Sequence, residues 1–331
     1  MGLQDGYLSA QGRHTPTMFV GSLPRDGNRS AKLAISLTSV ALLAGFLLEC
    51  KPKPSTDVFA RQNLVAWCII HYDSMHRCPL ARACMLKRLG IQRLAIDWRA
   101  EHIPTFDEEI DALRKNQITI QAFWVRGNMY PERNAPAAED GNLEVVLAAL
   151  KRNSVKTQIW DPFDADEEFT ALPESQRLAR ATEAVRYVAT RARQISCSVA
   201  IFSHGGWMGE PENELKVVDL VGMDNVGIVY DFEHGRAQMD RFPEFFPKLL
   251  PHLWSVILNG MQEGGPDFIT VGDGERDLGM LKVIRNSGYR GPIGIMNHNT
   301  NRDAEVGLRL NMEGLKKMLR QRDDRPALQT Y

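Results

Sequence analysis

The sequence has few cysteines and almost no net charge. Its five cysteines, Cys50, Cys68, Cys78, Cys84 and Cys197, include no CxxC pair. This spacing does not support a structural zinc site, and disulfide scaffolds are typical of much smaller chains. The formal net charge is -1 at pH 7 and the sequence shows no basic stripe. The composition therefore gives no support to a nucleic-acid partner.

A dinucleotide-binding fingerprint is also missing, because no GxGxxG turn follows the first apolar run. What the chain does contain is a regular alternation of short apolar runs and amphipathic segments. The runs predict strands at Leu64–Ile70, Gln92–Ile96, Ile118–Val125, Val155–Trp160, Ser198–Phe202, Val226–Tyr230, Trp254–Leu258 and Ile293–Met296. The segments between them predict helices at Leu80–Leu89, Phe106–Lys115, Leu143–Arg152, Glu174–Gln194, Asn213–Val221, Arg241–Leu250, Leu278–Asn286 and Asp303–Arg320. Eight such units predict a (β/α)8 TIM barrel over residues 58–331, with a doubly wound open sheet as the alternative.

The first 57 residues read as an N-terminal extension. Arg29 and Lys32 precede Leu33–Leu48, which carries no charge. Basic residues before a short apolar core are typical of an export signal, and the core is shorter than the roughly 20 residues of a membrane span. We therefore predict an exported protein, periplasmic or extracellular, whose membrane contact is limited to a lipid anchor at Cys50. Glu49 stands where a lipobox has a small residue. A buried core helix in a cytoplasmic protein is the alternative.

Polar side chains collect where the predicted strands end. Asp231 closes the run Val226–Tyr230, and His234 follows three residues later. In a barrel, the carboxyl ends of all the strands meet at the face that binds ligands. Five of the eight histidines fall at such ends, namely His71, His102, His204, His234 and His298.

These positions predict a pocket for a small polyol. Imidazoles titrate near neutrality, so we predict His204, His234 and His298 with Asp231 as the acid–base groups. Tryptophan faces stack on the C–H faces of sugars, while charged and amide groups bind hydroxyls. The predicted substrate-binding residues are Asp97, Trp98, Arg99, His102, Trp124, Trp160 and Asn259.

The order and spacing of several segments resemble the xylose isomerase-like TIM barrels, which include sugar phosphate isomerases and epimerases. The resemblance covers roughly residues 64 to 319. The segments that carry it are LGIQRLAID (89–97), VAIFSHGG (199–206), VGIVYDFEH (226–234), VGDGERD (271–277) and SGYRGPIGI (287–295).

The resemblance implies a divalent metal held by Glu, Asp, His and Glu from strands five to eight, which polarises a carbonyl or enediolate. Of these four ligands, only the aspartate is matched, by Asp231; His234 matches a further histidine that follows the aspartate. The strand-five Glu, strand-seven His and strand-eight Glu positions hold Phe202, Ile257 and Met296. We therefore expect any metal at Asp231 and His234 to bind weakly or to be a histidine-preferring ion such as zinc.

Two functional classes follow. One is an isomerase or epimerase acting on a small carbohydrate; the other is a carbohydrate-binding barrel that has lost the metal-dependent chemistry. A nucleic-acid function, by analogy with the endonuclease IV barrels, is a distant third, since the ligands of a three-metal cluster and a basic stripe are lacking.

Overall fold

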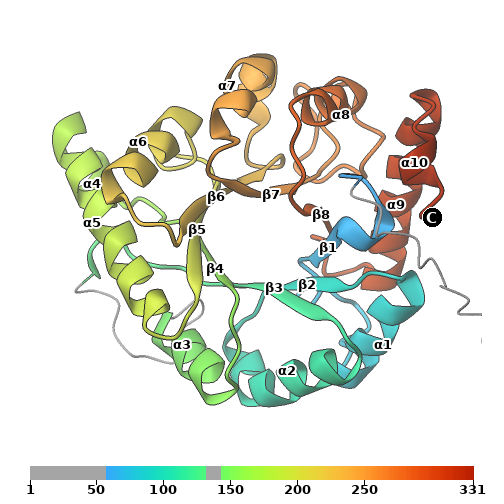
Figure 1. The fold of residues 1–331 in the computed structure, drawn as a ribbon, viewed down its shortest axis with the longest axis horizontal. Coiled ribbons are helices and arrows are strands. Elements are labelled where there is room, and N and C mark those ends of the chain that lie inside the picture. Colours follow the sequence, from blue (N-terminus) through green and yellow to red (C-terminus); the bar gives the residue numbers. More distant parts are fainter. Residues whose placement is uncertain (1–56, 132–142) are drawn as a thin grey trace, which may run out of the picture. The chain divides into compact units, whose positions relative to one another are not determined.

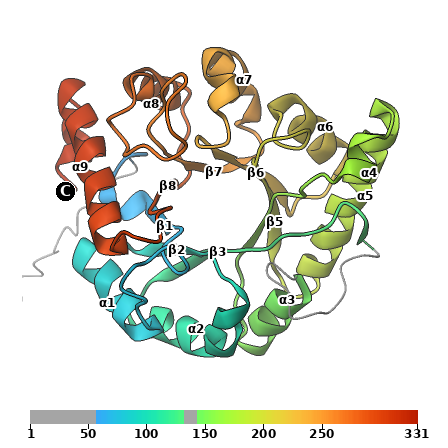
Figure 2. The same ribbon diagram turned by 180° about the vertical axis from the view of Figure 1, so that it is seen from behind.

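The structure, a computed structural model, describes residues 57–131 and 143–331. The predicted export signal and Cys50 lie outside the described residues. The predicted barrel is confirmed: eight parallel strands form one closed barrel in the order β1 to β8. Figure 1 shows the helices as an outer ring around these strands, and Figure 2 shows the same ring from behind.

The strands lie within the predicted runs or within one residue of them. They are β1 (Leu64–Trp67), β2 (Arg93–Ile96), β3 (Thr119–Trp124), β4 (Gln158–Asp161), β5 (Ser198–Phe202), β6 (Val226–Asp231), β7 (Leu253–Ile257) and β8 (Ile293–Met296). The barrel closes where β8 pairs with β1, from Leu64 opposite Ile293 to Trp67 opposite Met296.

The main helices follow the same alternation. They are α1 (Pro79–Leu89), α2 (Phe106–Lys115), α3 (Leu143–Arg152), α4 (Glu167–Thr170), α5 (Glu174–Arg193), α6 (Pro211–Val221), α7 (Phe242–Leu249), α8 (Asp277–Asn286), α9 (Ala304–Gln321) and α10 (Arg325–Leu328). Short 3-10 helices are η1 (Arg61–Asn63), η2 (Ala100–Thr105) and η4 (Arg236–Arg241). No helix among the described residues is long and apolar enough to cross a membrane.

The residues that flank α1 and α2 differ in whether they cap the helix. α1 ends at Gly90, which adopts the left-handed conformation that glycine allows without strain. Threonine is a common N-cap residue, but Thr105, which precedes α2, does not cap that helix with its side chain. Its hydroxyl instead donates to the carbonyl of His102, 2.9 Å away, because η2 runs directly into α2.

Alternate residues of each strand pack in two separate layers. In β5, Val199 and Ile201 join the large core between strands and helices, while Ala200 and Phe202 face the barrel interior. This is the period-two pattern of a strand. Small residues on some strands leave room inside the barrel for the larger side chains of others. The interior group contains Val65, Trp67, Cys68, Ala95, Ala122, Trp124, Trp160, Ala200, Phe202, Val229, Ile257 and Met296.

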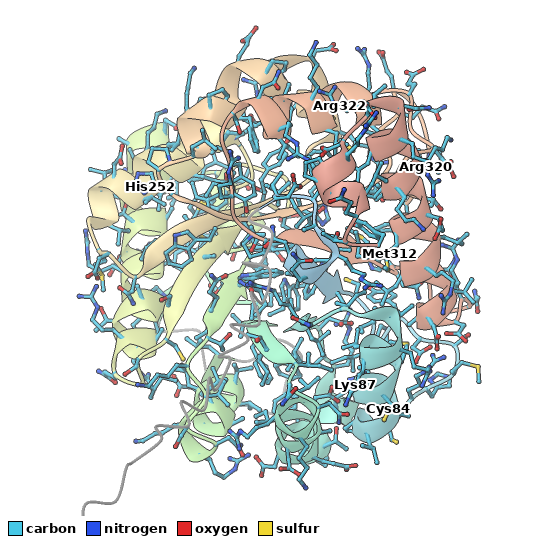
Figure 3. The ribbon with its side chains drawn as sticks, turned by 45° about the vertical axis from the view of Figure 1, so that its right-hand side comes forward. Cys84, Lys87, His252, Met312, Arg320 and Arg322 are labelled. Carbon is cyan, nitrogen blue, oxygen red and sulfur yellow. The ribbon has the colours of Figure 1, made fainter. Side chains whose placement is uncertain are left out.

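The helices of the outer layer carry both surface and core residues. Figure 3 shows Lys87 on α1 and Arg320 on α9, which are exposed, and Met312 on α9, which is buried against the core. His252 precedes β7 and therefore lies at the amino end of that strand, opposite the mouth where the predicted site residues gather (Figure 3).

Candidate functional site

The carboxyl ends of the strands surround a cavity of about 110 Å³. Interior side chains from four strands, Trp67, Trp124, Phe202 and Met296, line its apolar part together with Phe268. The polar part combines Asp231, the last residue of β6, with residues of the loops that follow the strands. These loop residues are Cys68, Tyr72, Asp97, Arg99, Arg126, His204, Glu233, His234 and His298.

Two histidines form one wall of this cavity. The ring centroids of His204, after β5, and His234, after β6, lie 4.1 Å apart. His204 Nδ1 lies 3.0 Å from Asp164 Oδ1, and His234 Nδ1 lies 2.7 Å from Glu233 Oε2. The hydrogen bond to Asp164 fixes the tautomer and orientation of the His204 ring, and the ion-pair contact with Glu233 orients the His234 ring. In both rings, Nε2 is left as the nitrogen that can exchange a proton.

Asp231 lies beside this pair at the end of β6. It is 2% exposed, and its Oδ1 accepts a hydrogen bond of 2.9 Å from the backbone N–H of Glu233. Burial, reinforced by the charge of Glu233, raises the pKa of Asp231 to about 7. An acid with such a pKa can both accept and return a proton near neutral pH.

The charges around the histidines reinforce one another. Burial opposes protonation of His234, but the carboxylates of Glu233, Asp231 and Asp164 outweigh it and raise its pKa. Burial alone would raise the pKa of Asp164, yet its contacts with His204 and Arg126 lower it. We therefore expect Asp164 to be a carboxylate and His234 to hold its proton more tightly than a free imidazole.

Arg236, in η4, connects Glu233 to the loop between β7 and α8. Its guanidinium donates to Glu233 Oε1 at 3.2 Å, to the carbonyl of Pro266 and to the carboxylate of Asp267. That loop carries Phe268, which is 42% exposed at the cavity mouth.

The cavity lining includes a third histidine. His298, after β8, sits between Tyr72 and Phe268, with ring centroids 3.8 Å and 4.0 Å away. Burial lowers the pKa of His298 to about 4. It is therefore neutral at physiological pH and a weak proton acceptor.

The cavity thus brings together most of the predicted site residues. Four of the predicted substrate-binding residues do not line it, and their contacts give the reason. They are Trp98, His102, Trp160 and Asn259.

The two tryptophans pack inside the protein, which corrects the prediction that they stack on a ligand. Asp97 faces the cavity, so the next residue, Trp98, points outward. Trp98 is fully buried, packs on Phe106 and donates from Nε1 to the carbonyl of Trp124 at 2.7 Å. Trp160 is also fully buried within the barrel interior, against Trp67.

The two polar residues are engaged in local structure. His102 Nδ1 accepts a hydrogen bond of 2.9 Å from the backbone N–H of Arg99. The side-chain amide of Asn259 donates to the carbonyls of Gly260 and Asp267, at 3.1 Å and 2.9 Å. Asn259 therefore shapes the β7–α8 loop and does not line the cavity.

Sequence reasoning missed several residues of the site. Trp67 was predictable, since it lies within the apolar run Leu64–Ile70 and is the last residue of β1, on its interior face. Glu233 and Asp164 follow strand-end aspartates in the sequence. Nothing in the sequence indicates that Tyr72 and Phe268 enclose His298, because both lie on loops.

Comparison with known proteins identifies the fold. No family model matches the sequence, and no curated protein matches it. Solved structures do match. The 3-keto-D-glucoside 4-epimerase YcjR from E. coli superposes with a TM-score of 0.58 at 14% identity, over 78% of this chain and 98% of that one. A xylose isomerase domain protein from Alicyclobacillus acidocaldarius superposes with a TM-score of 0.54 at 15% identity, over 78% of this chain and 98% of that one. The chain folds as a (β/α)8 TIM barrel similar to these structures. The IolI protein, solved with a bound zinc atom, superposes with a TM-score of 0.58 at 13% identity, over 78% of this chain and 98% of that one.

The residues at the metal positions of xylose isomerase-like barrels do not fit an oxygen-rich metal site here. Phe202 and Ile257 offer no donor atom, and the thioether of Met296 is a soft ligand. Among the described residues, no three histidine, cysteine or acidic side chains gather in a way that could hold a metal. Asp231 and His234, the predicted pair, therefore lack a third ligand. One Asp231 oxygen is already bonded to a backbone N–H, and His234 Nδ1 faces Glu233.

Proposed function

We propose that the protein binds a small carbohydrate at the barrel mouth and transfers a proton on it, as an isomerase of the aldose–ketose type. The observation that carries the proposal is the pair His204 and His234, each oriented by a carboxylate, beside Asp231 at the wall of the cavity. The sugar chemistry named for a structural neighbour such as YcjR supports the substrate class.

The reaction follows from the placement of these groups. Asp231, as a carboxylate, takes the proton from the carbon next to the carbonyl. The C–H electron pair forms a C=C bond, and the carbonyl π electrons move onto oxygen. His234 in its protonated form donates a hydrogen bond to that oxygen and offsets its charge. His204 then carries the proton of the neighbouring hydroxyl to that oxygen. Asp231 returns its proton to the former carbonyl carbon, where the C=C electron pair forms the new C–H bond, and the deprotonated second oxygen forms the new carbonyl.

The arrangement favours isomerisation over epimerisation. Epimerisation at one carbon needs a proton donor on the face opposite the base. Asp231, His204 and His234 come from adjacent strands and share one wall. His298, which follows β8, has a pKa of about 4, so it is a poor proton carrier at neutral pH.

A non-catalytic carbohydrate-binding barrel is the second candidate. Phe202, Ile257 and Met296 at the metal positions favour it, since they remove the donors that xylose isomerase-like barrels use. A single experiment separates the two functions. The protein is incubated in D₂O with a panel of aldoses and ketoses, and carbon-bound deuterium is followed by NMR.

Turnover predicts deuterium at the carbon next to the carbonyl with wild type, and a loss of at least about 100-fold with Asp231→Asn, since general acid–base groups contribute about 10²–10⁴-fold. Binding without any deuterium incorporation supports the non-catalytic barrel. Incorporation that persists undiminished in Asp231→Asn contradicts the assigned role.

A further inference from the structure

Arg99 is held at the cavity by neutral groups. Its two terminal nitrogens donate to the carbonyl of Trp98 at 2.7 Å and to the hydroxyl of Tyr72 at 3.3 Å. Its Cζ lies 5.7 Å from the centroid of the Tyr72 ring. A guanidinium has five N–H donors, so these two bonds fix its position and leave three donors for another partner.

The guanidinium also lacks a carboxylate partner among the described residues. Other arginines of the mouth are paired, Arg126 with Asp164 at 3.1 Å and Arg236 with Glu233 at 3.2 Å. The carboxylate of Asp97, two residues before Arg99, is occupied by three backbone N–H groups, those of residues 69 to 71. Arg99 therefore brings to the cavity an oriented guanidinium that has no direct ion-pair partner among the described residues.

His298 does not add a second positive charge beside Tyr72. His298 is neutral at physiological pH because its burial between Tyr72 and Phe268 lowers its pKa. The cavity also carries Asp97, Asp231 and Glu233. A dianionic phosphate would meet about twice the repulsion from these acids that a carboxylate meets. The planar fork of arginine matches a carboxylate with two parallel hydrogen bonds.

Building on the proposed carbohydrate function, we propose that the ligand is a sugar acid whose carboxylate binds Arg99. The apolar C–H face of such a ligand lies against Trp67 and Phe202, which aromatic side chains favour. Its hydroxyls and carbonyl then face the wall of His204 and His234. Arg99 is thus the residue that selects acidic sugars over neutral ones.

The test is calorimetric titration with matched ligands. The acids are D-glucuronate, D-galacturonate and D-gluconate. The neutral partners are D-glucose and D-galactose, and D-glucose 6-phosphate serves as the dianion. The proteins are wild type, Arg99→Gln, Arg99→Lys and, as the control, Arg88→Gln. Arg88 lies on α1 with an exposed side chain, so its replacement removes the same charge far from the cavity.

We expect wild type and the Arg88 variant to bind at least one acid about tenfold or more tightly than its neutral partner and the phosphate. That factor is what a charge-assisted hydrogen bond contributes. Arg99→Gln should remove this preference without weakening neutral sugars, and Arg99→Lys should restore part of it. Neutral sugars that bind as well as acids, an acid preference that survives in Arg99→Gln, or a preference for the phosphate would each overturn the sugar-acid assignment and leave the proposed function intact. If no carbohydrate binds to wild type, the proposed function and this inference both fail.

Discussion

Replacing Glu214 by Gln should change how the stability of the protein depends on pH. Glu214, on α6, is fully buried, and its Oε1 accepts a hydrogen bond of 2.6 Å from the hydroxyl of Ser203 at the end of β5. Its other oxygen is buried without a hydrogen-bond partner. Burial, aided by the charges of Glu210 and Glu212, raises the pKa of Glu214 from 4.5 to about 8.

Proton linkage gives the sign and size of this pH dependence of the free energy of unfolding. Below pH 4.5 both folded and unfolded chains are protonated at this site. Between pH 4.5 and 8 the unfolded chain ionises while the folded one keeps its proton, so stability falls as pH rises. Each pKa unit corresponds to 1.36 kcal/mol, so the shift of about 3.5 units amounts to at most about 5 kcal/mol by pH 8. Glutamine cannot ionise, and its amide oxygen can still accept from Ser203.

The assay is urea unfolding of wild type and Glu214→Gln at pH 5, 6, 7 and 8. We expect the free energy of unfolding of the variant, relative to wild type, to rise by about 1.4 kcal/mol per pH unit. Other buried acids, such as Asp161 and Asp231, occur in both proteins and cancel in the difference. A Ser203→Ala variant loses the bond that favours ionised Glu214, so its decline in stability should extend to higher pH. A difference between wild type and Glu214→Gln that stays constant across this range would refute the reasoning.

Three further changes test the packing and the loop. Trp98→Ala should lower the free energy of unfolding, measured by urea titration, by about 3–5 kcal/mol. Ligand affinity of the folded variant should stay within about twofold of wild type. A loss of affinity without a loss of stability would show that Trp98 belongs to the binding site. Arg82→Met should cost about 3–5 kcal/mol because it leaves the buried partner Glu109 unpaired, and adding Glu109→Leu should recover part of the loss; equal stability of single and double variants would argue against a buried ion pair. Arg236→Gln should speed amide exchange at residues 262–268, whereas Arg236→Lys should slow it again; unchanged exchange in both would show that Arg236 does not hold the loop.

The sequence predicts the barrel well because its signal is periodic. Each apolar run is long enough for a strand, and each ends where a polar residue begins. The same pattern places Asp231, His204 and His234 at one face, since the carboxyl ends of parallel strands must meet there. Successive residues of a strand point to opposite faces. Continuing the alternation of β2 would therefore have predicted that Asp97 faces the cavity and that Trp98 faces the helices.

The rest of the site depends on loops, whose course has no period. The enclosure of His298 by Tyr72 and Phe268, and the contact of Asp164 with His204, arise from turns whose geometry the sequence does not reveal. The resemblance to xylose isomerase-like barrels indicates where metal ligands would lie, but the residues at those positions differ in this chain. Phe202, Ile257 and Met296 all lie in the barrel interior.

The central claim is that the mouth around Asp231 and His204 binds a small carbohydrate. It is tested most directly by titrating one sugar panel into wild type, Asp231→Asn and His204→Ala, with the melting temperature of each recorded alongside. We expect wild type to bind at least one sugar and both variants to melt within a few degrees of wild type. The affinity of both variants for that sugar should fall by about tenfold or more. Two folded variants that bind every sugar as wild type does would contradict it.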